Sequence, residues 1–428
     1  MSDAREFDII VYGATGYTGR LVAEYLKTKT GLKWAMAGRS ADKLAEVRDL
    51  VGVAADTPLI VADASDPASL DAMVKRTKVV LTTVGPYQLY GNELVEACVA
   101  NGTDYTDLCG EPAWMRQKID QHNEAAKASG ARIVFSAGFD SIPFDLGVLM
   151  LQKHCVETFG APAPRVKGRV RAMKGTFSGG TAASMKATMA AASKDPAVIG
   201  YLTNPFSLAG GFEGPAQPAG NKPEYDESIG SWATSFVMAP INTKNVHRTN
   251  ALLGQAFGAD FVYDEMMLTG PGEQGEAMAK HVASTPMMGG DNDPKPGEGP
   301  TKEEREMFGH LISVSGIGPN TALIMLSSMT PDEIAHAILS EDVVSIQKIK
   351  GIGTKTAQRV IIDLKGKVSK MELGTENIFS SNNRNRFDAL IALVSLGFDK
   401  KSAEKVLDKI DTGTQTVEQL IKEALRLL

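Results

Sequence analysis

A glycine-rich segment near the N-terminus has the spacing of a dinucleotide-binding loop. It reads Gly13-Ala14-Thr15-Gly16-Tyr17-Thr18-Gly19, follows an apolar stretch and precedes an amphipathic one. In such a unit the first glycine allows a tight turn, the second lets the backbone approach a pyrophosphate, and the third lets the helix pack closely on the strand. Amides at the helix N-terminus attract the phosphates. We therefore expect residues 13–19 to bind a dinucleotide.

The end of the second apolar stretch indicates which dinucleotide. Where an NAD site usually carries an acid for the ribose 2′-hydroxyl, this chain has Arg39 and Ser40. A guanidinium can clamp a 2′-phosphate through two charge-assisted bonds, and the Ser40 hydroxyl can add a third, so NADP is favoured. The alternative is that Arg39 is a solvated surface residue. Asp63 either accepts a bond from the adenine amino group or caps the next turn.

A third segment follows the fourth apolar stretch, Val84–Gly91. The carboxyl edge of a parallel sheet is where nicotinamide and substrate meet in such folds, so we expect Gly85 to contact the cofactor and Tyr87 to be the leading proton-donor candidate. A tyrosine that only packs beside the loop is the alternative.

Two Gly-Ile-Gly segments, 35 residues apart, form an internal repeat in the C-terminal third. Glycines between two short helices let the turn lie flat on a phosphate, and the next helix presents free amides to it. Residues 348–370 carry seven basic residues and one acid, Asp363. The pattern predicts contact with the DNA backbone through 311–367, and helical hairpins used only for packing are the alternative. The candidate DNA-binding residues are Gly316, Gly318, Asn320, Gly351, Gly353, Lys355, Thr356 and Arg359.

Composition limits the class of protein. The 428 residues carry a net charge of −6, which excludes whole-molecule attraction to nucleic acid or anionic lipid but leaves local patches open. Three cysteines without a CxxC pair predict neither a disulfide framework nor a metal site. No apolar run approaches the ~18 residues of a membrane span, so we expect a cytoplasmic protein.

Short apolar stretches alternate with amphipathic ones from Phe7 to Ala137, which predicts a Rossmann-type, doubly wound parallel sheet of α/β class. An α+β second domain, an all-α helix-hairpin-helix pair and a small three-helix domain should follow. The six expected strands are Phe7–Tyr12, Lys33–Ala37, Pro58–Ala62, Lys78–Val84, Asp104–Leu108 and Arg132–Ala137. The predicted domains are 1–145 (NADP-binding), 146–285 (α+β, substrate), 286–300 (Pro/Gly linker or seam), 301–368 (tandem hairpins), 369–385 (flexible linker) and 386–428 (three-helix, partner-docking).

Residues 7–300 resemble the saccharopine dehydrogenase-like oxidoreductases, and more closely the trans-acting enoyl reductase branch. The matching segments are Tyr12–Gly19, Ala37–Ser40, Thr83–Gly91, Gly102–Glu111, Gly138–Gly147, Phe177–Met185 and Met238–Thr243. The resemblance implies NADPH-dependent reduction of the enoyl double bond of a lipid or polyketide acyl chain that a partner synthase delivers on a carrier. Asp107, Glu111 and Asp140 then become candidate groups around the substrate carbonyl, although Asp107 could instead cap a helix and Asp140 could shape a turn. Family members continue beyond Pro300 with a further segment that this chain replaces.

Residues 301–428 are similar to the second and third domains of the RuvA Holliday-junction subunit. Leu311–Leu326 and Ile349–Lys367 match its hairpin pair, and the terminal segment with Leu396-Gly397-Phe398 matches the module that docks the RuvB motor. The N-terminal OB-fold domain of that family is missing, so the resemblance implies salt-sensitive duplex contact.

The sequence thus predicts an NADP(H)-dependent oxidoreductase fused to a RuvA-like, DNA-binding and RuvB-docking part. One alternative is a RuvA-like Holliday-junction or DNA-binding protein with a non-catalytic N-terminal half. The other is an inactive chimera.

Overall fold

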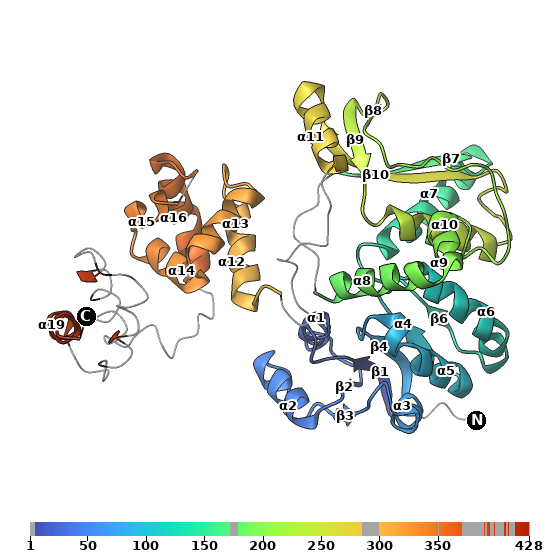
Figure 1. Cartoon of the computed structure of the whole chain (residues 1–428), viewed down its shortest axis with the longest axis horizontal. Coiled ribbons are helices and arrows are strands. Elements are labelled where there is room, and N and C mark those ends of the chain that lie inside the picture. The colour runs from blue at the N-terminus through green and yellow to red at the C-terminus, as the bar shows by residue number, and fades with distance from the viewer. Residues whose placement is uncertain are drawn as a thin grey trace. The chain divides into compact units, whose positions relative to one another are not determined.

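The structure is a computed structural model of the chain (Figure 1). It describes residues 5–171, 179–284, 299–349, 351–369, 389, 392–393, 398, 406–407, 410 and 416–427. The chain divides into two compact units, Met1–Gly299 and Pro300–Leu428. Among the described residues, no helix is long and apolar enough to span a bilayer.

The first unit begins with a six-stranded parallel sheet in the order β3-β2-β1-β4-β5-β6, so the doubly wound fold is confirmed. Neighbouring residues Ile10 and Val11 are both fully buried but belong to cores on opposite faces, because successive side chains of a strand alternate. The strands are β1 (Phe7–Tyr12), β2 (Trp34–Gly38), β3 (Leu59–Val61), β4 (Thr77–Thr82), β5 (Asp104–Thr106) and β6 (Ile133–Val134). The helices are α1 (Tyr17–Leu26), α2 (Ala41–Leu50), α3 (Pro67–Val74), α4 (Tyr87–Tyr90), α5 (Asn92–Asn101) and α6 (Pro112–Ser129).

A second, four-stranded mixed sheet follows in the order β7-β10-β9-β8. Its strands are β7 (Arg165–Val170), β8 (Glu224–Asp226), β9 (Ser231–Ser235) and β10 (Val262–Gly270), and its helices are α7 (Ile142–Phe159), α8 (Gly179–Lys194), α9 (Pro196–Thr203), α10 (Ala239–Leu252) and α11 (Gly272–Ser284). Strands and helices are mixed, as expected of an α+β region. Helix α7 runs through the boundary predicted at 145/146.

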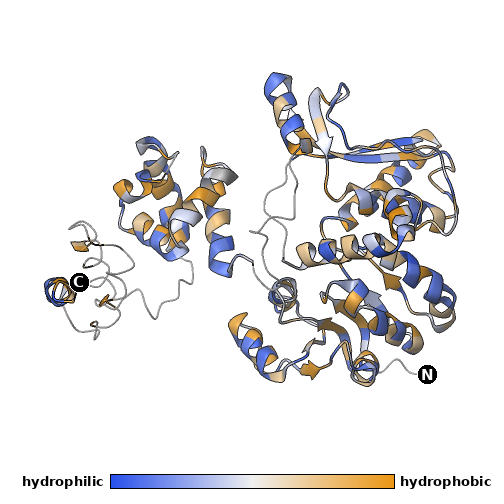
Figure 2. Cartoon of the chain, in the orientation of Figure 1, coloured by the Kyte–Doolittle hydropathy of each residue, from blue (hydrophilic) through white to orange (hydrophobic). Residues whose placement is uncertain are grey.

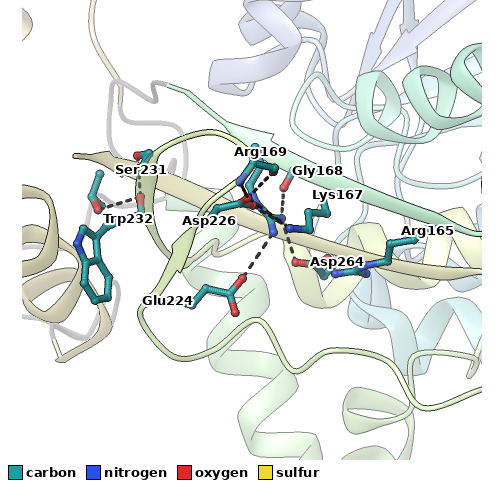
Figure 3. A network of polar contacts seen from close by, with 11 residues as sticks. Arg165, Lys167, Gly168, Arg169, Glu224, Asp226, Ser231, Trp232 and Asp264 are labelled. Carbon is teal, nitrogen blue, oxygen red and sulfur yellow. Dashed lines mark hydrogen bonds and ion pairs between the residues drawn. The ribbon is translucent and has the colours of Figure 1, made fainter. Parts of the chain in front are cut away.

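Charged side chains from three of these strands form a buried network (Figure 3). The Arg169 guanidinium, 5% exposed, lies 2.9 Å from Asp226 and 2.9 Å from Asp264. Lys167 also approaches Asp226, at 3.3 Å, and Arg165 bonds Asp264. Hydrogen bonds from Ser228, Arg169 and Lys167 outweigh the effect of burial and lower the pKa of Asp226 to about 2.

The second unit contains a five-helix bundle with one core, formed by residues such as Leu311, Ile338 and Leu364. Its helices carry hydrophobic and hydrophilic residues together (Figure 2), as expected where one face packs inward. They are α12 (Lys302–Ile312), α13 (Pro319–Ser328), α14 (Pro331–Leu339), α15 (Val343–Gln347) and α16 (Thr354–Val368).

Near the C-terminus, α19 (Val417–Ala424) begins with a capping box between Thr416 and Gln419. The other two predicted terminal helices and both predicted linkers lie largely outside the described residues.

Candidate functional site

The glycine loop has the geometry that a pyrophosphate needs. Gly13 has φ +88°, and the Gly16 amide donates to the Gly13 carbonyl at 3.0 Å. A Cβ atom on Gly19 would lie 2.1 Å from the Gly13 oxygen, so only glycine lets α1 approach β1 this closely. Helix α1 starts after Gly16 with no side-chain cap and no acid in its first turn. Its N-terminal amides are therefore available to a phosphate, and the loop fits a dinucleotide.

Two of the predicted cofactor residues follow β2. Arg39 is exposed and makes no hydrogen bond or ion pair with any described residue. Ser40 is the N-cap of α2, and its Oγ accepts a bond from the Lys43 amide at 3.3 Å. This bond leaves the hydroxyl proton of Ser40 available to a ligand.

Asp63, after β3, is occupied by its own turn. Its Oδ1 accepts bonds from the Ser65 amide at 2.8 Å and the Ser65 hydroxyl at 2.7 Å, and these two bonds lower its pKa. This is the turn-capping arrangement, and adenine recognition by Asp63 stays a prediction.

Tyr87 lies inside the first core and is 4% exposed. Its hydroxyl donates to the Thr82 carbonyl and accepts from the Leu108 amide, both at 3.4 Å, and its ring packs on Trp114 with the centroids 5.7 Å apart. Burial raises the pKa of Tyr87 well above its usual value. These contacts are the packing arrangement that was the alternative above, and the proton-donor role of Tyr87 stays a prediction.

Asp107 and Glu111 tie the loops at the carboxyl edge of the sheet together. Asp107 Oδ1 accepts from the amides of Cys109 (3.0 Å) and Ser136 (2.8 Å), and Oδ2 accepts from the Tyr105 hydroxyl (2.8 Å). Glu111 accepts from the amides of Tyr87 (2.8 Å) and Gln88 (2.9 Å).

Burial raises the pKa of Asp107 to about 7 despite those three hydrogen bonds. Both carboxyls hold backbone in place, because Asp107 accepts from two backbone amides and a core tyrosine, and Glu111 accepts from two backbone amides and from the Gln88 side chain. A direct part in the reaction stays a prediction for Asp107.

Asp140 lies at the join between the first sheet and the α+β region. Its carbonyl accepts a bond from Asn242 Nδ2 at 2.9 Å, and the same amide group donates to Glu265 Oε2 at 2.9 Å. Glu265 also accepts from the Tyr263 hydroxyl at 2.7 Å, and burial raises the pKa of Glu265 to about 7. Desolvation likewise raises the pKa of Asp140.

Three polar residues of this region were not identified from the sequence. Thr188, Asn242 and Glu265 come from segments far apart in the chain, and only the fold brings them towards the edge of the first sheet. Asn242 lies in Met238–Thr243, one of the segments that carry the resemblance, and this was the available signal.

The two hairpins of the second unit share one geometry. Gly316 and Gly351 have φ +95° and +91°, and Gly318 and Gly353 are N-caps without a side-chain cap. The isoleucines between them are buried in the common core. The described cations distinguish the second hairpin, because Lys355 and Arg359 are both exposed. Thr356 is half-buried, and the Asn320 side chain lies outside the described set.

Comparisons with known proteins agree with the division of the chain into two units at residues 299/300. Residues 9–134 match the saccharopine dehydrogenase NADP binding domain, 308–366 the SAM-like helix-hairpin-helix tandem, and 385–428 the RuvA C-terminal domain. A Mycobacterium tuberculosis protein named as a candidate trans-acting enoyl reductase is 42% identical over 328 residues, which cover 71% of this chain and 78% of that protein. The chain belongs to the trans-acting enoyl reductase family.

A Mycobacterium leprae protein named trans-acting enoyl reductase is also 42% identical, over 281 residues that cover 63% of this chain and 67% of its own. Among solved structures, the apo saccharopine dehydrogenase (L-Glu forming) of Saccharomyces cerevisiae is 12% identical with a TM-score of 0.37, covering 84% of this chain and 71% of that one. The chain is therefore an oxidoreductase with a nicotinamide-cofactor domain, and it also carries helix-hairpin-helix and RuvA-like domains. Its architecture is chimeric.

Proposed function

We propose that residues 1–299 form an NADPH-dependent enoyl reductase acting on a lipid or polyketide acyl chain. The observation that carries the cofactor assignment is the exposed Arg39 guanidinium, which follows β2 and makes no hydrogen bond or ion pair with the described residues, although its charge helps to lower the pKa of Asp63. When bound, NADPH supplies the hydride. The chain's part is to hold the pyrophosphate at residues 13–19, the 2′-phosphate at Arg39 and Ser40, and the nicotinamide end near Gly85.

Titration of NADPH and NADH into the full chain, followed by nucleotide fluorescence, tests the cofactor assignment. Losing charge-assisted bonds worth about 1.5–3 kcal/mol in Arg39→Ala should weaken NADPH binding about 10- to 100-fold and leave NADH binding unchanged. Lys33→Ala is the matched control, because Lys33 is exposed just before the opposite end of the same strand. Equal affinity of the wild-type chain for the two cofactors would refute the assignment.

The acyl substrate is supported by the names of the relatives, which are trans-acting enoyl reductases. NADPH oxidation in the presence of crotonyl-coenzyme A or a longer unsaturated acyl thioester tests it. Reduction of the double bond, identified by mass spectrometry of the product, is the expected result. Oxidation of NADPH that does not depend on the thioester would count against an enoyl substrate.

We propose contact with the DNA backbone as a second function, carried by the second hairpin. Lys355 and Arg359 make no hydrogen bond or ion pair with any described residue, whereas Lys365 bonds Glu341 and Lys367 donates to Ser313 Oγ at 2.9 Å. The free amides after Gly353 lie in the first turn of α16 with Lys355, and Arg359 lies one turn further along the same helix. One phosphate can therefore contact the amides and Lys355, and Arg359 can contact a neighbouring phosphate.

Fluorescence anisotropy with duplex DNA at several salt concentrations tests this second function. Two lost phosphate contacts in Lys355→Gln/Arg359→Gln should reduce the slope of log affinity against log salt by about 2. Lys422→Gln, on α19, is the control and should leave the slope unchanged. Salt-independent binding would contradict the proposal.

Docking of a RuvB-like motor through residues 386–428 stays a prediction from the resemblance.

A further inference from the structure

Helix α8 lies against the loop that follows β4, at the carboxyl edge of the first sheet (Figure 1). Gln88 Nε2 donates to Thr188 Oγ1 at 3.2 Å and to Glu111 Oε2 at 2.9 Å. Thr188 is 8% exposed, so this bond is shielded from water. The helix is thereby joined to the same network that holds the loops after β4 and β5.

Ser184 lies one turn before Thr188 and therefore on the same face of α8. Its Oγ is 3.6 Å from the position that a Cβ atom on Gly85 would occupy. The side chain is half-buried, and its hydroxyl makes no hydrogen bond with any described residue. It thus differs from Tyr87, whose hydroxyl contacts two backbone groups inside the core.

Ser184 lies close to the point of the first sheet where the strand order reverses. The strand order reverses between β1 and β4, and ligands of open parallel sheets bind in the crevice outside the carboxyl ends at such a point. Gly85 follows β4 there. Ser184 therefore brings a hydroxyl of the α+β region next to Gly85, at the sheet edge where this rule expects cofactor and substrate to meet.

We propose that Ser184 lines the nicotinamide end of this crevice and donates a hydrogen bond to the carbonyl oxygen of the acyl substrate. The inference rests on the proposed enoyl reduction. In that reaction the β-carbon accepts the hydride of NADPH, the carbon–carbon double bond is lost, negative charge moves to the carbonyl oxygen, and the α-carbon takes a proton from solvent or a nearby acid. A donor on that oxygen stabilises the charge as it develops.

The residues next to Ser184 suit an acyl chain. Met185 directly follows Ser184, and Met189 directly follows Thr188. Their side chains are 41% and 61% exposed. Being one turn apart, they form an apolar strip beside Ser184 on the same helix. Flexible thioether side chains adapt to alkyl groups of different shape.

Thiol labelling tests the position of Ser184 without requiring turnover. In the full-length Ser184→Cys variant, NADPH should slow alkylation of the new thiol by iodoacetamide at least several-fold. Ser193→Cys is the matched control, because Ser193 lies on the exposed end of the same helix and should be labelled at the same rate with and without NADPH. The wild-type chain measures the background from the half-buried Cys155. A fluorescence titration of the same variants measures NADPH binding independently.

Kinetics of Ser184→Ala test the hydrogen bond. Loss of one such donor should lower kcat with crotonyl-coenzyme A about 100-fold, while the Kd of NADPH stays unchanged and Ser184→Thr keeps part of the activity. Unprotected labelling in a chain that binds NADPH would overturn the inference and leave the proposed function standing, as would a normal kcat in Ser184→Ala. A raised Kd for NADPH in Ser184→Ala would assign the hydroxyl to the cofactor and overturn the carbonyl contact. A wild-type chain that binds no NADPH, or binds it and reduces no unsaturated thioester, would refute the proposed function and this contact with it.

Discussion

Two buried carboxyls, Asp107 and Glu265, accept hydrogen bonds that connect segments around the candidate site. Burial raises the pKa of each to about 7. Each accepts a bond from a buried tyrosine hydroxyl, at 2.8 Å for Asp107 and 2.7 Å for Glu265. Their ionisation costs free energy in the folded state because the charge is desolvated, although the bonds offset part of that cost.

Asp107→Asn should change how stability depends on pH. The pKa of Asp107 rises from 3.8 to about 7 on folding, so between these values the folded wild-type chain holds a proton that the unfolded chain has lost. Wild-type stability therefore falls as pH rises through this window, by at most about 1.4 kcal/mol per pH unit from this group. The neutral amide removes this fall, and the stability of the variant relative to wild type should increase with pH in urea unfolding.

Asp63→Asn is the contrasting control. The pKa of Asp63 is lowered in the folded chain, so its contribution to stability is present above the unfolded pKa and is lost as pH falls. This variant should lose stability relative to wild type at neutral pH and recover it in acid. If the stability of wild type and Asp107→Asn depended on pH in the same way, burial would not be raising the pKa of Asp107.

Gly19→Ala tests the close packing of α1 on the glycine loop. The new Cβ would lie 2.1 Å from the Gly13 oxygen and 2.8 Å from Ala14 Cα, so backbone has to move. We expect a loss of about 1–3 kcal/mol in the free energy of unfolding and a large loss of NADPH affinity. Gly147→Ala is the control, because nothing lies within 4 Å of its added Cβ on α7. Unchanged cofactor binding in Gly19→Ala would contradict the assigned loop.

At the scale of elements, periodic patterns could be predicted and contacts between distant segments could not. The six expected strands match β1–β6, because buried parallel strands are continuous apolar stretches. The Gly-Ile-Gly repeat appears as two hairpins of equal geometry because positive φ at Gly316 and Gly351 is a local requirement. The position of α8 and the burial of Tyr87 depend on which segments meet in the fold. No local pattern encodes this.

The charged network of the second sheet is another feature that sequence alone does not predict. Arg165 and Arg169 lie on one strand, β7, while their acids come from β8 and β10. Asp226 is 57 residues from Arg169, and Asp264 is 95 residues from Arg169 and 99 from Arg165. The side chain of Arg169 is 5% exposed and that of Arg165 34%. The two arginines therefore offer a matched comparison within one strand.

Arg169→Met should destabilise the first unit strongly. Removing this guanidinium leaves Asp226 and Asp264 buried with fewer cations, which typically costs about 3–5 kcal/mol. Arg165→Met should cost clearly less, because its partner Asp264 keeps Arg169 and water reaches the site. Chemical unfolding measures both. Equal losses in the two variants would show that burial of the pair does not set its contribution.

At the scale of the whole molecule, each unit has a core of its own. Leu94 and Tyr105 belong to a core in the first unit, and Leu364 and Ile338 to the core of the second. The chimeric architecture joins an oxidoreductase part to RuvA-like domains whose expected ligands, a nicotinamide cofactor and DNA, have no chemistry in common. Each part should therefore keep its own stability and respond only to its own ligand.

Scanning calorimetry of the full chain should show two transitions. Saturating NADPH should raise the midpoint of one of them, because a ligand that binds only the folded form stabilises the unit that holds its site. Leu364→Ala, a truncation of a fully buried side chain that typically costs about 2–5 kcal/mol, should lower the midpoint of the other by roughly 5 °C or more. Leu94→Ala is the reciprocal control and should lower the transition that NADPH raises. If both variants and NADPH moved a single common transition, the two units would unfold as one cooperative body, and an activity of either part would have to be measured as a property of the whole chain.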